Sequence, residues 1–235
     1  MSFNLPDPRE AVFILDPEAG LTDGNRWRDS GPHGLHVTPV NHVAPAYGIA
    51  VGPSGASYIG FDGATQRGTL PLDFYRWTPT NAVTAIAAFR CPTPAVSDRI
   101  FDCTDANNGI RLNVDPAAAE RIRLTAMVGG VACYATATAN IPLTGRTRVV
   151  VASVRVSNTM ASGRAVWVDG VQIAATAAGT AAALAYTTTV VPTVGSVVGG
   201  GGNFFDDLLY YLALWPRIFS HAEAQAITAM LRDRM

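Results

Sequence analysis

The chain has 235 residues and a formal net charge of -1, and 49% of its residues are hydrophobic while 15% are charged. This composition supports a packed core and excludes an intrinsically disordered chain. Its 17 basic residues are nearly balanced by 18 acidic ones. Because the basic residues form no run, the sequence gives no electrostatic signal for nucleic-acid binding.

The first eight residues lack the basic and apolar regions of a secretory signal peptide. No stretch approaches the ~20 apolar residues of a membrane-spanning helix. We therefore expect synthesis in a bacterial cytoplasm and no membrane insertion. The cysteines, Cys91, Cys103 and Cys133, are odd in number and lack the close spacing of a zinc site, which favours free thiols in or near the core.

An alternation of apolar and polar residues predicts β-strands along much of the chain. Residues 110–114 and 122–128 alternate regularly, as half-buried antiparallel strands do. Residues 85–90 and 149–156 also have the composition of strands. Asn107-Asn108-Gly109 predicts a turn before the strand that starts at residue 110.

The last part of the chain contains two local signals with clear physical causes. Asp169-Gly170, flanked by short apolar runs, predicts a two-residue hairpin because both turn residues tolerate positive φ. Residues 204–215 predict a final strand that ends at Pro216, which has no backbone N–H to donate. Ser220 and Glu223 then form a capping box that starts a helix reaching Arg234.

The helix is expected to place Ala224, Ile227 and Leu231 on one face. No linker, charge run or repeat divides the chain. The sequence therefore predicts one domain over residues 1–235, an all-β sandwich of two antiparallel sheets with a short C-terminal helix.

Four segments resemble elements of laminin-G-like, concanavalin A-like lectin and glucanase jelly rolls. They are residues 29–36 (Asp-Ser-Gly-Pro-His-Gly-Leu-His), 58–63 (Tyr-Ile-Gly-Phe-Asp-Gly), 166–171 (Val-Trp-Val-Asp-Gly-Val), and 194–196 followed by 205–207. Asp207 stands where the family usually has glycine. The resemblance extends over nearly the whole chain and implies the same sandwich fold, but fold alone does not fix a ligand.

Glucanases with this jelly roll carry a Glu-x-Asp-x-x-Glu strand, which places two carboxylates side by side for hydrolysis. None of the glutamates here has an acidic partner at that spacing. They are Glu10, Glu18, Glu120 and Glu223. The histidines are His33, His36, His42 and His221, and they accompany no Gly-x-Ser-x-Gly nucleophile motif. The sequence therefore predicts a protein that is not an enzyme.

The strongest metal candidate lies between residues 98 and 109. Asp102, Asp105 and Asn107 could offer oxygen ligands to calcium, although their spacing is not that of an EF-hand. Asx turns explain the same residues without a metal. No cofactor is expected, and calcium stays open as the alternative.

Aromatic side chains are the usual sugar platforms because the apolar face of a pyranose packs on a ring. Trp27, Tyr47 and Trp77 lie in loop-like sequence and are the glycan-binding candidates. Trp167 and Trp215 lie in predicted strands and are expected in the core.

Small stand-alone laminin-G-like domains occur among phage structural proteins, so the resemblance implies a virion location. The expected function is that of a non-enzymatic structural or adhesion protein, as a head decoration, spike or fibre module of a tailed phage or phage-like particle. Expected partners are capsid or tail proteins, host surface polysaccharide and further copies of the chain, since avidity and virion symmetry both favour homo-oligomers. The alternative is a host-encoded bacterial carbohydrate-binding lectin module.

Overall fold

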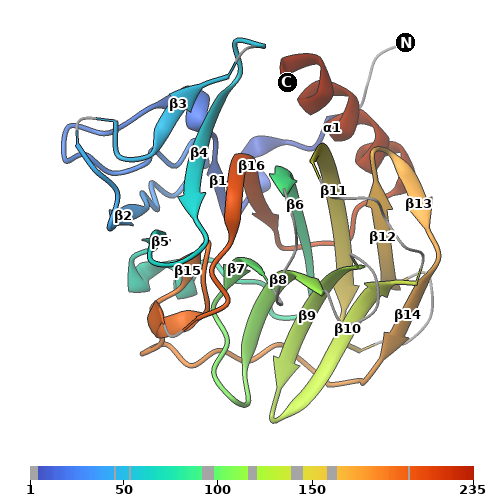
Figure 1. Ribbon diagram of the computed structural model, residues 1–235. Helices are drawn as coiled ribbons and strands as arrows, with labels where there is room; N and C mark the ends of the chain where they lie inside the picture. Colours follow the sequence, from blue (N-terminus) through green and yellow to red (C-terminus); the bar gives the residue numbers. More distant parts are fainter. Residues whose placement is uncertain are drawn as a thin grey trace.

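Figure 1 shows the computed structural model of the protein. It describes residues 5–44, 46–52, 54–91, 98–115, 121–138, 145–157, 163–200 and 202–235. For Cys91, Asp115 and Asp207 it describes the backbone alone. Two antiparallel eight-stranded sheets face each other, and helix α1 (His221–Arg234) packs on the outer side of one of them. The predicted fold class, an all-β sandwich with a short C-terminal helix, is confirmed.

The first sheet has the strand order β13-β12-β11-β6-β16-β4-β3, with β1 also paired to β16. Its strands are β1 (Phe13–Leu15), β3 (Ile49–Val51), β4 (Ser57–Asp62), β6 (Ala82–Cys91), β11 (Arg146–Arg155), β12 (Arg164–Val168), β13 (Val171–Ile173) and β16 (Asp206–Trp215). The long strand β16 therefore lies inside the sheet, between β6 on one side and β4 with β1 on the other.

The second sheet has the order β14-β10-β9-β8-β7-β15-β5-β2. Its strands are β2 (Thr38–Val40), β5 (Arg67–Thr69), β7 (Arg99–Asp102), β8 (Gly109–Asp115), β9 (Arg121–Val128), β10 (Val131–Ala137), β14 (Ala175–Ala178) and β15 (Thr193–Val194). The described residues also form four short 3-10 helices: η1 (Pro8–Glu10), η2 (Pro17–Ala19), η3 (Leu72–Arg76) and η5 (Val198–Gly200).

The main core lies between the two sheets, and the sequence pattern follows from it. In β8 and β9 alternate residues enter this core, so these strands show a regular alternation. In β11, Val150 and Ala152 face the other sheet, whereas Val149 and Val151 face α1. Because both sides of β11 are covered, its sequence is a continuous apolar run.

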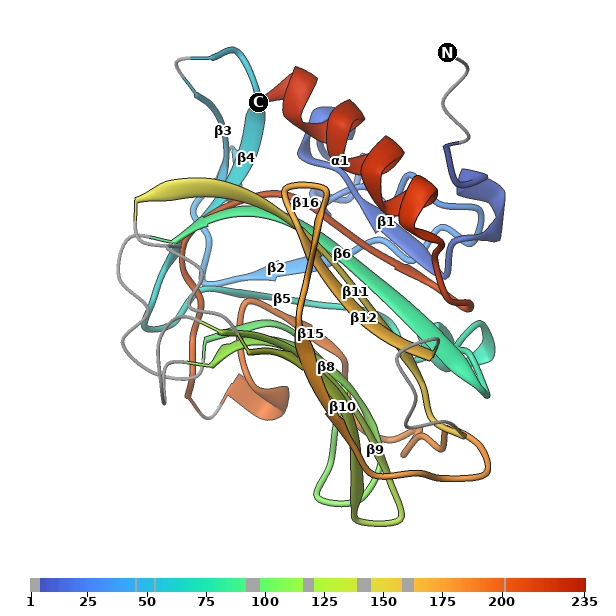
Figure 2. The same ribbon diagram turned by 90° about the vertical axis from the view of Figure 1, so that its right-hand side faces the viewer.

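Trp167 and Trp215 are buried, with 3% and 1% of their surface exposed, which confirms the prediction that both lie in a core. That core is the layer between the first sheet and α1, which Figure 2 shows lying across the outer side of β6 and β11. The indole Nε1 of Trp167 donates to His221 Nδ1 at 2.9 Å, and that of Trp215 donates to the Asp7 carbonyl at 3.3 Å.

The local predictions for the end of the chain are confirmed. Asp169 and Gly170 adopt φ values of 53° and 80° and join β12 to β13. Ser220 and Glu223 make both hydrogen bonds of the capping box. Asp207, which stands where laminin-G-like domains usually have glycine, lies in β16 and pairs with Phe61 of β4. This difference therefore falls in the strand ladder.

Two of the cysteines, Cys103 and Cys133, are buried free thiols as predicted, while the Cys91 side chain lies outside the described residues. Among the segments that the structure describes, no helix has the length and apolar character needed to cross a membrane.

Candidate functional site

Trp27 is fully buried, which corrects the prediction that it is a surface platform for sugars. Its backbone pairs with that of Val37, and its indole Nε1 donates to the Tyr47 carbonyl at 2.8 Å. Gly68 leaves room for the ring, because a Cβ at that glycine would lie 2.4 Å from the indole. A ligand therefore has no access to Trp27.

Tyr47 is half-buried and adopts a positive φ of 47°. Its carbonyl holds the indole of Trp27, so its backbone has a structural role. Whether its ring contacts a ligand stays a prediction.

Trp77 is exposed, with 45% of its surface accessible, and it stacks on His33. The ring centroids are 3.7 Å apart and the planes differ by 7°. We call His33 and Trp77 the aromatic platform. The other tryptophans are at most 3% exposed, so Trp77 is the one tryptophan that a dissolved ligand can reach.

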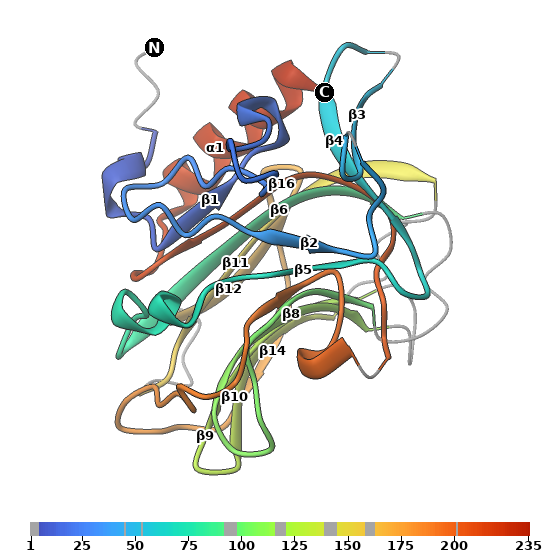
Figure 3. The same cartoon turned by 90° about the vertical axis from the view of Figure 1, so that its left-hand side faces the viewer.

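The platform is held in place from the η3 side by buried aromatic residues. Trp77 directly follows η3, which lies at one end of the sandwich (Figure 3). Phe74 is fully buried and packs against Phe13 and Phe101 at centroid distances of 6.1 and 5.7 Å. Tyr75 donates its hydroxyl to the Val190 carbonyl at 2.7 Å. Trp77 is therefore presented on a rigid element.

His33 lies in a loop that Asp29 organises. The Asp29 carboxylate accepts hydrogen bonds from the backbone N–H groups of Ile14, Gly31 and Leu35 at 2.7 to 2.8 Å. The backbone N–H of Asp29 donates to His36 Nδ1 at 3.0 Å. The Asp-Ser-Gly segment therefore fixes the loop that carries His33, a role that the sequence did not assign.

The surroundings of the platform combine apolar surface with charge. Leu72 is 49% exposed, and Asp73 and Arg76 form an exposed ion pair at 3.4 Å. Since His33 covers one face of the Trp77 indole, a sugar ring would pack on the opposite face. Charged groups nearby can exchange hydrogen bonds with sugar hydroxyls.

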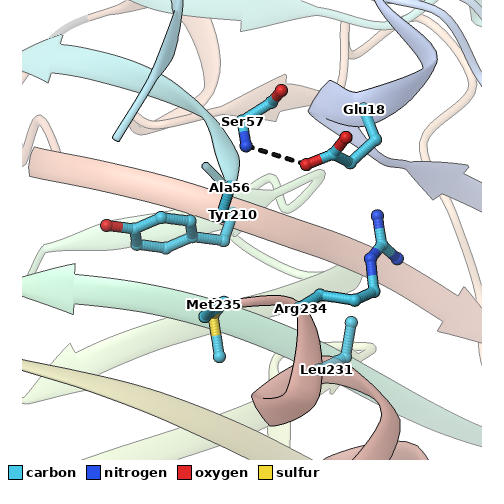
Figure 4. Close-up of a pocket in the computed structure, with 7 residues that line it drawn as sticks. All are labelled: Glu18, Ala56, Ser57, Tyr210, Leu231, Arg234 and Met235. Atoms are coloured by element: carbon cyan, nitrogen blue, oxygen red, sulfur yellow. Dashed lines mark hydrogen bonds between the residues drawn. The ribbon is translucent and has the colours of Figure 1, made fainter. Parts of the chain in front are cut away.

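A second surface feature is a narrow pocket between the end of α1, β4 and η2 (Figure 4). Its cavity volume is about 10 Å³, the size of a single water molecule. The charged groups around it already have partners, because Glu18 accepts from the Ser57 N–H at 2.8 Å and Arg234 pairs with Asp16 at 2.9 Å. This pocket is a packing gap without room for a sugar.

The candidate calcium ligands Asp102, Asp105 and Asn107 make contacts within the chain, and calcium binding by them stays a prediction. Asp102 accepts from the backbone N–H and the hydroxyl of Thr104, and Asp105 accepts from the N–H groups of Asn107 and Asn108. These contacts are those of Asx turns. Across the described parts of the chain, no three His, Cys, Asp or Glu side chains gather in a group that could hold a metal.

The described glutamates have structural contacts. Glu10 pairs with Arg217 at 2.9 Å, Glu18 binds the Ser57 backbone, and Glu223 caps α1. Glu120 lies outside the described residues. The arrangement needed for two-carboxylate hydrolysis is therefore not formed by these three side chains.

The histidines of residues 33 to 42 occupy three different environments rather than one cluster. His42 is buried against Trp27 and Phe61, at ring distances of 4.9 and 5.5 Å. Neither of its nitrogens has a hydrogen-bond partner among the described residues. Burial lowers the pKa of His42 to about 4, and nearby Asp62 opposes this shift. His42 is therefore held as a neutral ring in the core.

The two facing antiparallel sheets define a β-sandwich of the jelly-roll, lectin-like kind. Solved structures that share this fold include binding domains of botulinum neurotoxins. One is from neurotoxin type C, whose uptake into cells is described as dependent upon interaction with two ganglioside molecules; its TM-score is 0.66 at 9% identity, covering 95% of this chain and 52% of the toxin chain. Another is the neurotoxin DC binding domain in complex with SialylT, with a TM-score of 0.63, 9% identity and the same coverage.

A third structure is the DC binding domain with rat synaptotagmin II, with a TM-score of 0.63 at 8% identity, covering 95% of this chain and 52% of that chain. This chain thus spans about half the length of these proteins. At such low identity the likeness establishes the fold alone. No protein-family model and no curated protein matches the sequence.

Proposed function

We propose that the protein is a non-enzymatic, glycan-binding module of a tailed phage or phage-like particle, where it acts as a head decoration, spike or fibre subunit. The observation that carries the glycan part is the exposed Trp77 ring stacked on His33. An indole fixed on a rigid element offers a sugar a flat apolar face at low entropic cost.

Two further observations support this proposal. The structures that share the fold are binding domains of toxins, and two of them are described with a ganglioside or with SialylT. Within the described residues, the glutamates Glu10, Glu18 and Glu223 are engaged by arginine or backbone partners. The virion assignment rests on the resemblance to stand-alone phage domains.

Tryptophan fluorescence tests the glycan site directly, because Trp77 is the only exposed tryptophan. Titration with bacterial surface polysaccharide should change the Trp77 emission. Trp77→Ala should weaken binding at least about tenfold, which corresponds to about 1.4 kcal/mol. Val171→Ala, at a 62% exposed position on the hairpin beside α1, is the matched control and should bind normally.

His33→Ala removes the stacking partner and should weaken binding less than Trp77→Ala, because the indole remains. If both platform variants bind as tightly as the parent, the platform is not the glycan site.

A further inference from the structure

Strand β14 forms one edge of the second sheet. Among the described strands it pairs with β10 alone, so its other side has no neighbouring strand. The preceding strand, β13, is an edge strand of the first sheet, and both strands lie along the same side of the molecule (Figure 1). An unpaired strand edge can accept a further strand, and proteins usually protect such edges with charged residues, proline or a bulge.

The edge at β14 has none of these protections. The strand reads Ala-Thr-Ala-Ala, its register with β10 has no bulge, and no charged residue or histidine occurs from residue 170 to residue 205. The opposite edge of the same sheet differs, because β2 contains Pro39, which has no backbone N–H to donate. The second sheet therefore has one protected edge and one unprotected edge.

The hydrogen bonds to β10 determine which backbone groups of β14 face outward. The Thr138 N–H donates to the Ala174 carbonyl at 2.8 Å, so these two residues form a hydrogen-bonded pair. In an antiparallel ladder, hydrogen-bonded pairs alternate with pairs that exchange no hydrogen bond. In the register with β10, Ala175 and Ala177 fall in pairs of the second kind. Their N–H and C=O groups therefore point away from β10.

Contacts on the inner side of the edge hold β14 in place. Arg164 of β12 donates to the carbonyls of Ala178 and Gly179, so the end of β14 is tied to the first sheet. Ala175 packs against the main core, whereas the Thr176 side chain is exposed. A strand that is already ordered loses little entropy when another strand pairs with it.

We propose that two copies of the protein dimerise by antiparallel pairing of β14 with β14 of the partner, about a two-fold axis at Thr176. In this register Ala175 lies opposite Ala177 of the partner subunit, and Ala177 lies opposite Ala175 of the partner subunit. Each of these two symmetric pairs exchanges two backbone hydrogen bonds. The proposal rests on the homo-oligomer of the proposed function, and it adds the surface through which the copies meet.

A second copy fits this edge better than a charged partner does. A two-fold axis brings identical residues together, so a charged edge would repel its own copy. Alanine and threonine cause no such repulsion, and threonines directly opposite each other can exchange a hydrogen bond. A strand of four residues buries little surface, so the dimer should dissociate on dilution. Two copies carry two aromatic platforms, which raises the avidity for a polymer.

Sedimentation equilibrium over a dilution series tests the interface. Thr176→Arg places like charges across the two-fold axis, and Ala177→Pro removes an outward N–H that the ladder with β10 does not use. Each variant should raise the dissociation constant of the dimer at least about tenfold, with a melting temperature close to that of the parent. Thr38→Arg makes the same charge change at an exposed threonine of the opposite edge strand, β2, and should leave the dimer intact.

Cross-linking tests the register itself. Across the axis the two copies of Thr176 form a pair without hydrogen bonds, in which the Cα atoms lie roughly 4.5 Å apart, within the range of a disulfide. Oxidation of Thr176→Cys by air should therefore give a covalent dimer. The parent and Thr38→Cys should not cross-link under the same conditions, since Cys103 and Cys133 are buried.

The possible outcomes separate the interface from the proposed function. A chain that is monomeric at every concentration, yet whose Trp77 emission responds to polysaccharide, would overturn the inference and leave glycan binding standing. A dimer that survives Thr176→Arg, or that Thr38→Arg also dissociates, would overturn the inference and leave the homo-oligomer standing. If Thr176→Cys cross-links but no polysaccharide changes the Trp77 emission, the interface is correct and the proposed function fails.

Discussion

At the scale of single residues, His42 should make stability depend on pH. Its pKa is about 4 in the folded chain, against roughly 6.5 for an unfolded histidine. The unfolded chain therefore takes up a proton near pH 6.5 that the folded chain refuses until about pH 4. Stability contributed by neutral His42 is present above pH 6.5 and is lost as pH falls toward 4, by up to about 3 kcal/mol.

Asp98 acts in the opposite direction over the same range. Burial, together with the nearby Asp206, raises its pKa to about 7, so its contribution to stability falls as pH rises from about 4 to 7.

The effects of His42 and Asp98 are separated by urea unfolding of the parent and His42→Leu at pH 7.5, 6 and 5. The stability of the variant relative to the parent should increase as pH decreases. A constant difference would show that His42 does not resist protonation.

Residues also show where sequence reasoning fails. Trp27 and Trp77 both lie in loop-like sequence, yet one is fully buried and the other is 45% exposed. The direction of Trp27 depends on Gly68 and on the Tyr47 carbonyl, which are distant in sequence. His33 and Trp77 likewise meet only in the folded chain. Contacts between residues so far apart in the sequence leave no local sequence pattern from which they could be predicted.

At the scale of elements, α1 and the first sheet are joined by a core of their own, and Trp215 is central to it. Its ring packs against Phe219 at 5.4 Å and is 1% exposed. Trp215→Ala should therefore lower the free energy of unfolding by roughly 3–5 kcal/mol, since a large buried ring leaves a cavity. Chemical denaturation measures this loss.

The control for Trp215→Ala is Trp77→Ala, which removes the same side chain from an exposed position. It should change stability by no more than about 0.5 kcal/mol. Similar losses in the two variants would mean that the layer beneath α1 contributes little to the fold.

Elements that depend on a few adjacent residues were predictable. The hairpin follows from the positive φ that Asp169 and Gly170 accept, and the start of α1 follows from Ser220 and Glu223. The neighbours of outward residues on other strands were not predictable, because they depend on the register of β7, β8 and β9. The alternation in residues 110–114 predicts which residues point outward, but not which other residues lie beside them.

At the scale of the whole molecule, the proposed virion role predicts a fixed place in a particle. When particles from the source are purified and sedimented, the protein should accompany capsid or tail proteins at constant stoichiometry.

The isolated protein should form a homo-oligomer, because shallow sugar sites gain useful affinity when several copies engage one surface. Recovery only as a free monomer would favour the host-encoded lectin, and turnover of a β-glucan would contradict both.

The fold class was predictable because it depends on the period of the hydrophobic pattern, which extends along the chain. The choice of ligand was not, because the same sandwich presents different side chains in different proteins. That the chain is a single domain over residues 1–235 stays a prediction.

The position of β16 has a consequence for how the protein is made. The strand comes last in chain order, yet it lies between β6 and β4 and also pairs with β1, the first strand. While a ribosome is still translating the earlier strands, β6 has one unpaired edge and the halves of the sheet cannot join. The first sheet can therefore be completed only after β16 has left the ribosome, and chaperones that shield exposed strand edges should matter most before that point.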